Sequence, residues 1–143
     1  MPLPAEVYRH DRYYRNEQQE WEAKYLVILA FTPGRAVIHR TLTSRRNGRP
    51  EAPPCYHGDP YPGYFLGIPG DSVTRPTWVD LRATDDYDSN DFDAAMANGT
   101  LQLTMTLPLP MICAVLSCAA NAEDTTWQQH QALLDQKAQL NCL

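Results

Sequence analysis

The segment 41–46 (TLTSRR) is the part of the sequence best suited to chemistry, because hydroxyl and guanidinium groups follow one another in it. In an extended chain alternate side chains share a face, so Thr41 and Thr43 are expected to point to one side. Arg45 and Arg46 then stand at the end of the strand. A guanidinium is a planar fork of donors that matches a phosphate, so the pattern predicts a phosphate-binding strand end. A polar strand end without a ligand is the alternative interpretation.

Phosphate binding of this kind is compatible with cleavage of RNA. That reaction removes a proton from a 2′-hydroxyl, protonates the leaving oxygen and neutralises an anionic phosphorane. A hydroxyl donor, a fixed cation and a proton carrier can do this without a metal ion. Thr43 is the candidate hydroxyl donor and His39 is a candidate proton carrier. His10 stands in a neighbouring predicted strand and could share a face with His39, although neither belongs to a recognisable motif.

Charge is distributed unevenly along a chain whose formal net charge is −5. Residues 1–50 carry nine Lys and Arg against five Asp and Glu, a local balance of +4, whereas residues 51–100 have a balance of −7. Basic residues confined to one segment can form a positive face on an acidic protein, and such a face attracts phosphates. Ordinary solubilising charge is the other interpretation of this asymmetry.

The segments that would position these residues have the patterns of strands. Residues 6–14 are rich in aromatic and β-compatible types, and residues 25–31 form an apolar run typical of a central strand buried on both faces. Pro33 and Gly34 predict a type II turn into a partner strand at 35–43. The polar residues 15–23 are expected to form a loop. Shorter strands are expected at 64–68, 77–81 and 101–105.

Between and after these strands the sequence predicts one long loop and several helices. Residues 44–63 are dense in Pro, Gly and Asn, which predicts an ordered loop without regular structure. The acidic run 85–93 lacks the Gly and Glu of a calcium loop and is expected to cap a short helix. Residues 109–120 and 125–140 have helical spacing, the second with Thr125 and Gln128 as a capping box. Strands followed by helices favour an α+β, mainly β, domain.

The four cysteines, Cys55, Cys113, Cys118 and Cys142, include no pair at C-x-x-C spacing. Cys113 and Cys118 lie in an apolar helical pattern, where a thiol usually behaves as a small buried hydrophobe. We therefore expect free, reduced thiols, no metal site and no cofactor, which fits a cytoplasmic location.

A length of 143 residues fits a single domain over residues 1–143, with strands over about 5–106 and helices over about 107–141. The hydrophobic fraction of 43% and the charged fraction of 20% are those of a globular protein rather than a disordered one. The longest apolar stretches, 25–31 and 107–120, are shorter than the roughly 20 residues of a membrane span. Residues 1–10 lack the apolar run of a secretory signal. The sequence therefore predicts a cytoplasmic protein with no membrane partner.

The order of these segments resembles the plasmid-maintenance toxins of the MazF/PemK family. Residues 15–30 (RNEQQEWEAKYLVILA) are similar to that family's polar first loop and apolar second strand. Residues 37–44 (VIHRTLTS) resemble its third strand, which ends in a Thr-Ser pair. Residues 78–81 (WVDL) resemble the following strand, and residues 99–119 resemble the closing strand and terminal helix. The resemblance implies a small SH3-like barrel with C-terminal helices.

For function, the resemblance implies a metal-independent endoribonuclease that cleaves single-stranded RNA, forms a homodimer and is held inactive by an antitoxin protein. The family uses a Thr at the end of its third strand, matched here by Thr43. It also uses an Arg at the start of its second strand, where this chain has Lys24. Lys keeps the charge but loses the planar fork of donors. Arg12, Arg15 and Arg45 are the candidates for the missing guanidinium.

Two functional hypotheses follow from these patterns. In the first, the catalytic residues are Thr43, Lys24 and His39. The residues that would then bind RNA phosphates are Arg12, Arg15, Ser44, Arg45 and Arg46. In the second, the protein is a non-catalytic barrel that binds a protein partner through the loop 45–63, whose Tyr56 and Tyr61 are of the type that anchors interfaces. Only the first predicts an RNA affinity that falls steeply with salt.

Overall fold

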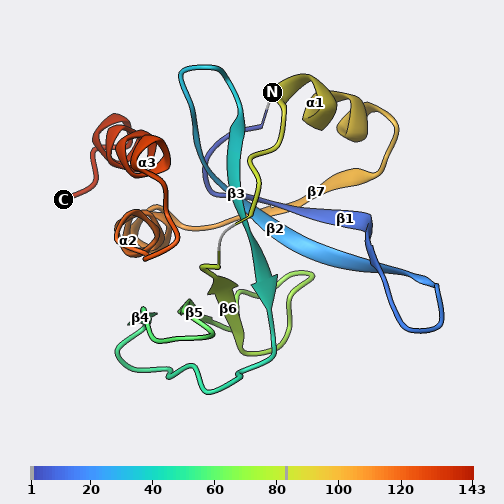
Figure 1. Cartoon of the computed structure of the whole chain (residues 1–143), viewed down its shortest axis with the longest axis horizontal. Helices are drawn as coiled ribbons and strands as arrows, with labels where there is room; N and C mark the ends of the chain where they lie inside the picture. The colour runs from blue at the N-terminus through green and yellow to red at the C-terminus, as the bar shows by residue number, and fades with distance from the viewer. Residues whose placement is uncertain (1, 83) are drawn as a thin grey trace.

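The strands pair side by side around the hairpin that the sequence predicts. A computed structural model describes residues 2–82 and 84–143, and in this part of the chain the strands form one antiparallel sheet in the order β4-β5-β6-β3-β2-β1-β7 (Figure 1). The seven strands are β1 (Glu6–Arg15), β2 (Trp21–Phe31), β3 (Val37–Thr43), β4 (Cys55–Tyr56), β5 (Gly63–Gly67), β6 (Thr77–Asp80) and β7 (Leu101–Thr106). The prediction of an α+β, mainly β fold is confirmed at this level.

Helices cover both faces of the sheet. On one face, α2 (Leu109–Ala120) and α3 (Trp127–Gln139) pack together, and α1 (Ser89–Ala97) lies on the other side (Figure 1). Strand β2 contributes to both cores because its side chains alternate: Val27 and Leu29 join the α2–α3 core, whereas Leu26 and Ile28 join the α1 core. All four are fully buried, so β2 is the two-sided central strand that its apolar run predicts.

The helix patterns are largely confirmed. Helix α2 has the predicted bounds, with Pro in its first turn, where a missing backbone donor costs little. Asp88 caps α1, its carboxylate accepting hydrogen bonds from the backbone N–H groups of Asn90 and Asp91. The capping box of α3 is formed by Thr126 and Gln129, one residue later than predicted. Among the described residues, no helix combines the length and the apolar character needed to cross a membrane.

Three local predictions for the first half of the chain differ from the structure. The loop predicted at 15–23 is confined to 16–20, because β1 and β2 pair as far as Arg15 and Trp21. The turn after β2 is not type II, since that turn needs a positive φ at Gly34 and here Arg35 has it, at 67°. The loop 44–63 contains β4, which pairs with β5. Tertiary pairing decides these details.

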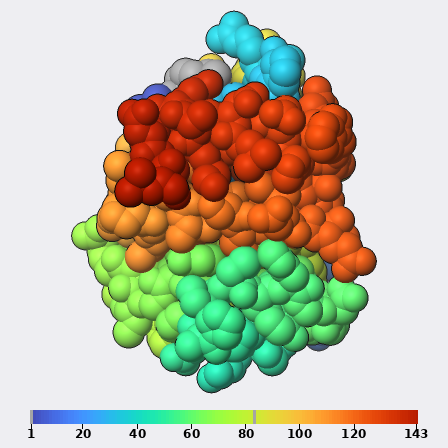
Figure 2. Space-filling model, turned by 90° about the vertical axis from the view of Figure 1, so that its left-hand side faces the viewer, coloured from blue at the N-terminus to red at the C-terminus, as the bar shows by residue number. Residues whose placement is uncertain are grey.

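The prediction of free thiols is also wrong, because Cys55 is bonded to Cys118 and Cys113 to Cys142. The first disulfide joins β4 to α2, and its two cysteines are 63 residues apart in the sequence. Figure 2 shows these two parts in contact, with the green segment that contains β4 lying against the orange α2. Cysteine spacing alone does not show this contact, and the inference of a cytoplasmic location from reduced thiols loses its basis.

Candidate functional site

Lys24, Thr43 and Arg45 line one cleft, although they come from β2, the end of β3 and the loop that follows. The cleft consists of two adjoining hollows, of about 300 and 610 Å³, and these three residues line both. Alternation along β2 places Lys24 on the same face as Leu26, which is the face that carries α1. We call the two hollows the cationic cleft, defined by Lys24, Thr43, Arg45, Arg49, Asp80 and Arg82.

The cationic cleft carries an excess of positive charge in a protein that is acidic overall. Among the described residues, four cationic side chains and one carboxylate line its larger hollow. A concave surface lined by one sign of charge concentrates counter-ions of the other sign. The cleft is therefore suited to an anionic ligand.

Asp80 organises the positive charges at the base of this cleft. Its carboxylate accepts hydrogen bonds from Nε and Nη2 of Arg82, at 2.7 to 3.1 Å, and lies 3.5 Å from Nη2 of Arg49. Burial opposes ionisation of Asp80, but the hydrogen bonds from Arg82 and the charge of Arg49 outweigh it, so its pKa lies below the ordinary value. Asp80 therefore stays ionised and positions its neighbours instead of transferring a proton.

Arg49 connects the long loop to the floor of the cleft. Its side chain is 1% exposed, and its guanidinium donates hydrogen bonds to the backbone carbonyls of Arg45 and Pro62. The ring of Tyr61 lies 5.3 Å from this guanidinium and 5.1 Å from that of Arg82. Tyr61 thus belongs to the cleft. It is half-buried, whereas the second hypothesis needs a tyrosine that is freely exposed to a protein partner.

Lys24 is the residue of the cleft best suited to carry a proton. Its side chain is half-buried, and burial lowers its pKa below the ordinary value. The charges of Arg82, Arg45 and Arg49 lower the pKa further, while Asp80 opposes the shift. A lowered pKa increases the fraction of neutral amine near physiological pH, and only the neutral amine can accept a proton.

Thr43 is held in an orientation that suits a donor. Its Oγ1 accepts a hydrogen bond of 3.1 Å from the backbone N–H of Arg45. A hydroxyl that accepts in this way keeps its own hydrogen for a ligand. Arg45 lines the same two hollows as Thr43, so the cleft contains both a hydroxyl donor and a guanidinium.

The remaining predicted phosphate ligands are placed differently. Ser44 lines the smaller hollow, but Arg12, Arg15 and Arg46 line neither. The guanidinium of Arg15 lies 4.7 Å from the centre of the Trp21 ring. That of Arg46 donates to the backbone carbonyl of Arg49 and lies 3.6 Å from Glu51.

His39 does not line the cleft either. It is 4% exposed, its ring packs 5.9 Å from that of Tyr87, and burial lowers its pKa to about 4. Alternation puts His39 on the same face of β3 as Thr43. However, the segment that leads into α1 pairs with the start of β3 at Val37, and its Tyr87 packs against His39. The backbone pairing of His39 with Ile28 places it deep in the sheet, away from solvent. The structure therefore does not bring His39 to the other two predicted catalytic residues.

The residues of the cleft that were not among the predicted catalytic or RNA-binding residues include Arg49, Tyr61, Asp80 and Arg82. One sequence signal was available for two of them. Trp78, Asp80 and Arg82 are each two residues apart. In an extended chain they lie on the same side, which brings a carboxylate and a guanidinium together. Arg49 and Tyr61 lie in a loop whose path depends on tertiary contacts, so no local pattern places them in this cleft, and Tyr61 was expected only as an anchor for a protein partner.

Comparison of the chain with protein-family models, with curated proteins and with solved structures gives no significant match. The geometry and charge of the cationic cleft are therefore the basis on which a function is proposed.

Proposed function

We propose that this protein is a metal-independent endoribonuclease that cleaves single-stranded RNA in the cationic cleft. The observation that supports the proposal is that Lys24, Thr43 and Arg45 line the same cleft, although only a folded sheet brings them together. A lowered-pKa amine, an oriented hydroxyl and a guanidinium are three of the groups that the reaction needs. Tyr13 and Tyr14 line the same hollow and offer aromatic faces on which unpaired bases can stack.

The proposed reaction begins at Lys24. Its neutral amine removes the proton from a ribose 2′-hydroxyl, and the 2′-oxygen attacks the adjacent phosphorus. The bond from phosphorus to the 5′-oxygen then breaks, so the products are a 2′,3′-cyclic phosphate and a 5′-hydroxyl. The other groups stabilise this path: Thr43 donates its hydroxyl hydrogen to a non-bridging oxygen, and Arg45 balances the charge of the phosphorane.

The leaving 5′-oxygen needs a proton, and Tyr13 is placed to supply it. Burial, with the charge of Asp80, raises the pKa of Tyr13, so its hydroxyl stays protonated over the physiological range. An alkoxide is far more basic than a phenolate, so a tyrosine can still protonate it. Lys24 gains one proton and Tyr13 loses one in each turnover, and exchange with solvent restores both.

The resemblance to MazF/PemK toxins extends the proposal to the fold and the partners. An antiparallel sheet of seven strands, with α2 and α3 after the last of them, is compatible with an SH3-like barrel, and the proposal includes the closure of the sheet into such a barrel. It also includes a homodimer and an antitoxin protein that inhibits the enzyme. An antitoxin segment with acidic side chains would fit the charge of the cationic cleft.

Purified protein incubated with a long single-stranded RNA in EDTA tests the cleavage. We expect discrete fragments with the unaltered chain and with the Arg15→Ala control, since Arg15 lies outside the cleft. Thr43→Ala should leave the RNA intact while keeping the thermal transition of the unaltered chain. Intact RNA in all three reactions would contradict the proposal and would favour the partner-binding module instead.

A further inference from the structure

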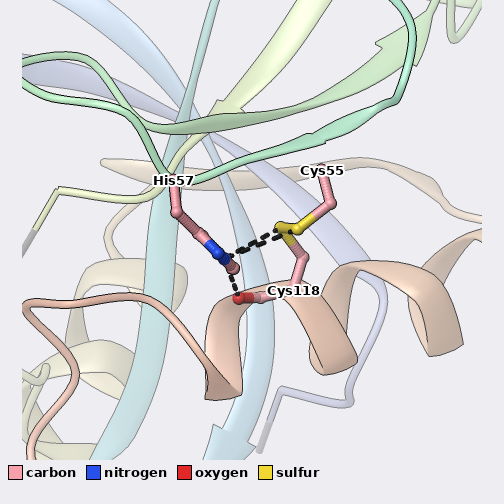
Figure 3. Close-up of side chains that lie close together, drawn as sticks. All are labelled: Cys55, His57 and Cys118. Atoms are coloured by element: carbon pink, nitrogen blue, oxygen red, sulfur yellow. Dashed lines mark hydrogen bonds between the residues drawn. A yellow bond between two sulfur atoms is a disulfide. The ribbon is translucent and has the colours of Figure 1, made fainter.

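A histidine lies against one of the two disulfides. Nε2 of His57 is 3.5 Å from Sγ of Cys55 and 3.6 Å from Sγ of Cys118, and it also lies 2.9 Å from the backbone carbonyl of Cys118. Figure 3 shows the imidazole directed at both sulfur atoms. The ligand atoms of these three residues all lie within 4.8 Å of one another. The group is distinct from the cationic cleft, because none of the three residues lines it.

We propose that the thiolates of Cys55 and Cys118, once their disulfide is reduced, bind one zinc ion together with Nε2 of His57. Two thiolates and an imidazole are ligands that zinc favours over harder oxygen ligands. With Zn–S of about 2.3 Å, Zn–N of about 2.05 Å and a tetrahedral angle, the nitrogen and each sulfur should be about 3.6 Å apart. The two observed nitrogen-to-sulfur distances, 3.5 and 3.6 Å, match that separation. The two sulfur atoms, bonded to each other in the disulfide, must move to about 3.8 Å apart once it is reduced.

The ligands differ in exposure, and this gives a route for the reductant and the metal. Cys118 is 3% exposed, Cys55 is half-buried and His57 is exposed. A dithiol reductant attacks Sγ of Cys55, and the thiolate of Cys118 leaves. The second thiolate of the reductant then releases Cys55 and closes its own disulfide, so two electrons pass to the protein. Zinc takes up both cysteines as thiolates, and any thiol protons go to solvent.

The site needs a particular tautomer of His57. A nitrogen that donates a hydrogen bond to a carbonyl cannot also bind a metal, so the proton of the ring moves to Nδ1 when Nε2 binds zinc. Three protein ligands leave a fourth position for water, as in open zinc sites. The metal would then replace the disulfide as the link between β4 and α2.

The second disulfide is the natural control. Among the described residues, the group of Cys55, His57 and Cys118 is where three potential ligands converge, and Cys113 and Cys142 belong to no such group. The two pairs otherwise join α2 to neighbouring parts of the chain in similar ways. A metal that binds any pair of reduced thiols would not distinguish them, whereas the proposed site would.

Titration of the full chain with Co²⁺, after reduction with a phosphine under anaerobic conditions, tests the proposal. We expect thiolate-to-cobalt charge-transfer absorption that saturates at one equivalent and disappears when Zn²⁺ is added. The Cys113→Ser/Cys142→Ser chain should behave in the same way. His57→Ala should weaken binding at least tenfold, because loss of even a residue that supports a metal ligand typically costs about 10–100-fold in affinity. His130→Ala should leave the affinity unchanged.

Several results would overturn the proposal. They are the absence of charge-transfer absorption in the reduced chain, equal absorption in Cys55→Ser/Cys118→Ser, and equal affinity in His57→Ala. Circular dichroism before metal addition reports whether the reduced chain is folded. If the reduced chain is unfolded and cobalt binds without restoring its helical circular dichroism signal, the ligands do not come from the folded structure, and the proposal is contradicted.

Discussion

The buried carboxylate of Asp80 lies 3.5 Å from the buried guanidinium of Arg49, at the floor of the cationic cleft. The contact joins β6 to the loop after β3, two parts of the chain that do not pair as strands at this point. It also fixes the position of Tyr61, whose ring lies against Arg49. The long loop is therefore ordered from within the cleft as well as by the disulfide of Cys55.

Replacement of Asp80 by Ala should destabilise the protein strongly. Arg49 would remain buried without an opposite charge, and breaking a buried pair in this way typically costs about 3–5 kcal/mol. Urea denaturation monitored by tryptophan fluorescence measures the change. Arg82→Ala is the matched control: Arg82 is half-exposed, so its loss should cost about 1 kcal/mol or less. Equal effects of the two substitutions would contradict the role assigned to Arg49.

Lys24 should determine the alkaline dependence of RNA cleavage. Because its pKa is lowered, the rate should rise with pH and level off below the ordinary lysine value of 10.5. Lys24→Arg keeps the charge but cannot lose its proton, so it should bind RNA and not cleave it. Lys24→His should retain some activity with the rising limb moved to lower pH. An unchanged pH profile in the histidine variant would exclude Lys24 as the base.

Thr43 should matter through its hydroxyl and not through its shape. Thr43→Val preserves the branched side chain and removes the donor, so the cleavage rate should fall about 10²–10³-fold. Thr43→Ser keeps the hydroxyl and should retain most of the rate. Single-turnover kinetics at saturating enzyme separate this effect from binding. A valine variant as fast as the serine variant would show that the hydroxyl plays no part.

Arg45 and Arg46 form a matched pair for RNA binding. Arg45 lines both hollows of the cleft, whereas Arg46 lies beside Glu51. Loss of one phosphate contact reduces the slope of log affinity against log salt by about one. We expect that reduction in Arg45→Ala and no change in Arg46→Ala, measured by fluorescence anisotropy with labelled RNA. A reduced slope in Arg46→Ala and an unchanged slope in Arg45→Ala would place the RNA phosphates at Arg46, outside the cationic cleft.

His39 should make the fold sensitive to acid. Its pKa is about 4 in the folded protein and 6.5 when unperturbed, so between these values the unfolded chain binds a proton that the folded chain does not. Stability is therefore unaffected above about pH 7 and falls as the pH decreases towards 4. The loss reaches roughly 2–3 kcal/mol at about pH 4.5. Urea denaturation of His39→Phe should lack this part of the acid dependence, and an identical pH dependence would contradict it.

The strands and helices could be predicted because their signals are local. The apolar run of β2, the helical spacing of α2 and the acidic cap before α1 depend on neighbours within a few residues. The wrong predictions involve other kinds of contact. The hairpin of β1 and β2 continues through polar residues because the strands already pair, and the position of the positive φ after Pro33 depends on how β3 leaves the turn.

The candidate site was predicted only in part, for the same reason. Alternation places Thr43 at the end of a strand, whereas Lys24 entered as a candidate only through the family resemblance. The ion pair of Arg49 with Asp80 joins distant segments, and no local pattern indicates it. His39 was predicted to be a catalytic residue, and alternation does place it on the same face as Thr43. Tyr87 packs against it, and the sequence gives no sign of that contact.

The most direct test of the proposed reaction compares two 5′-labelled single-stranded RNAs of the same sequence in EDTA, one with 2′-hydroxyls and one fully 2′-O-methylated. If Lys24 activates the 2′-oxygen, the first is cut to fragments that end in a 2′,3′-cyclic phosphate, and the second binds but stays intact. Cleavage of both RNAs, or of neither, would contradict the proposed reaction in the cationic cleft.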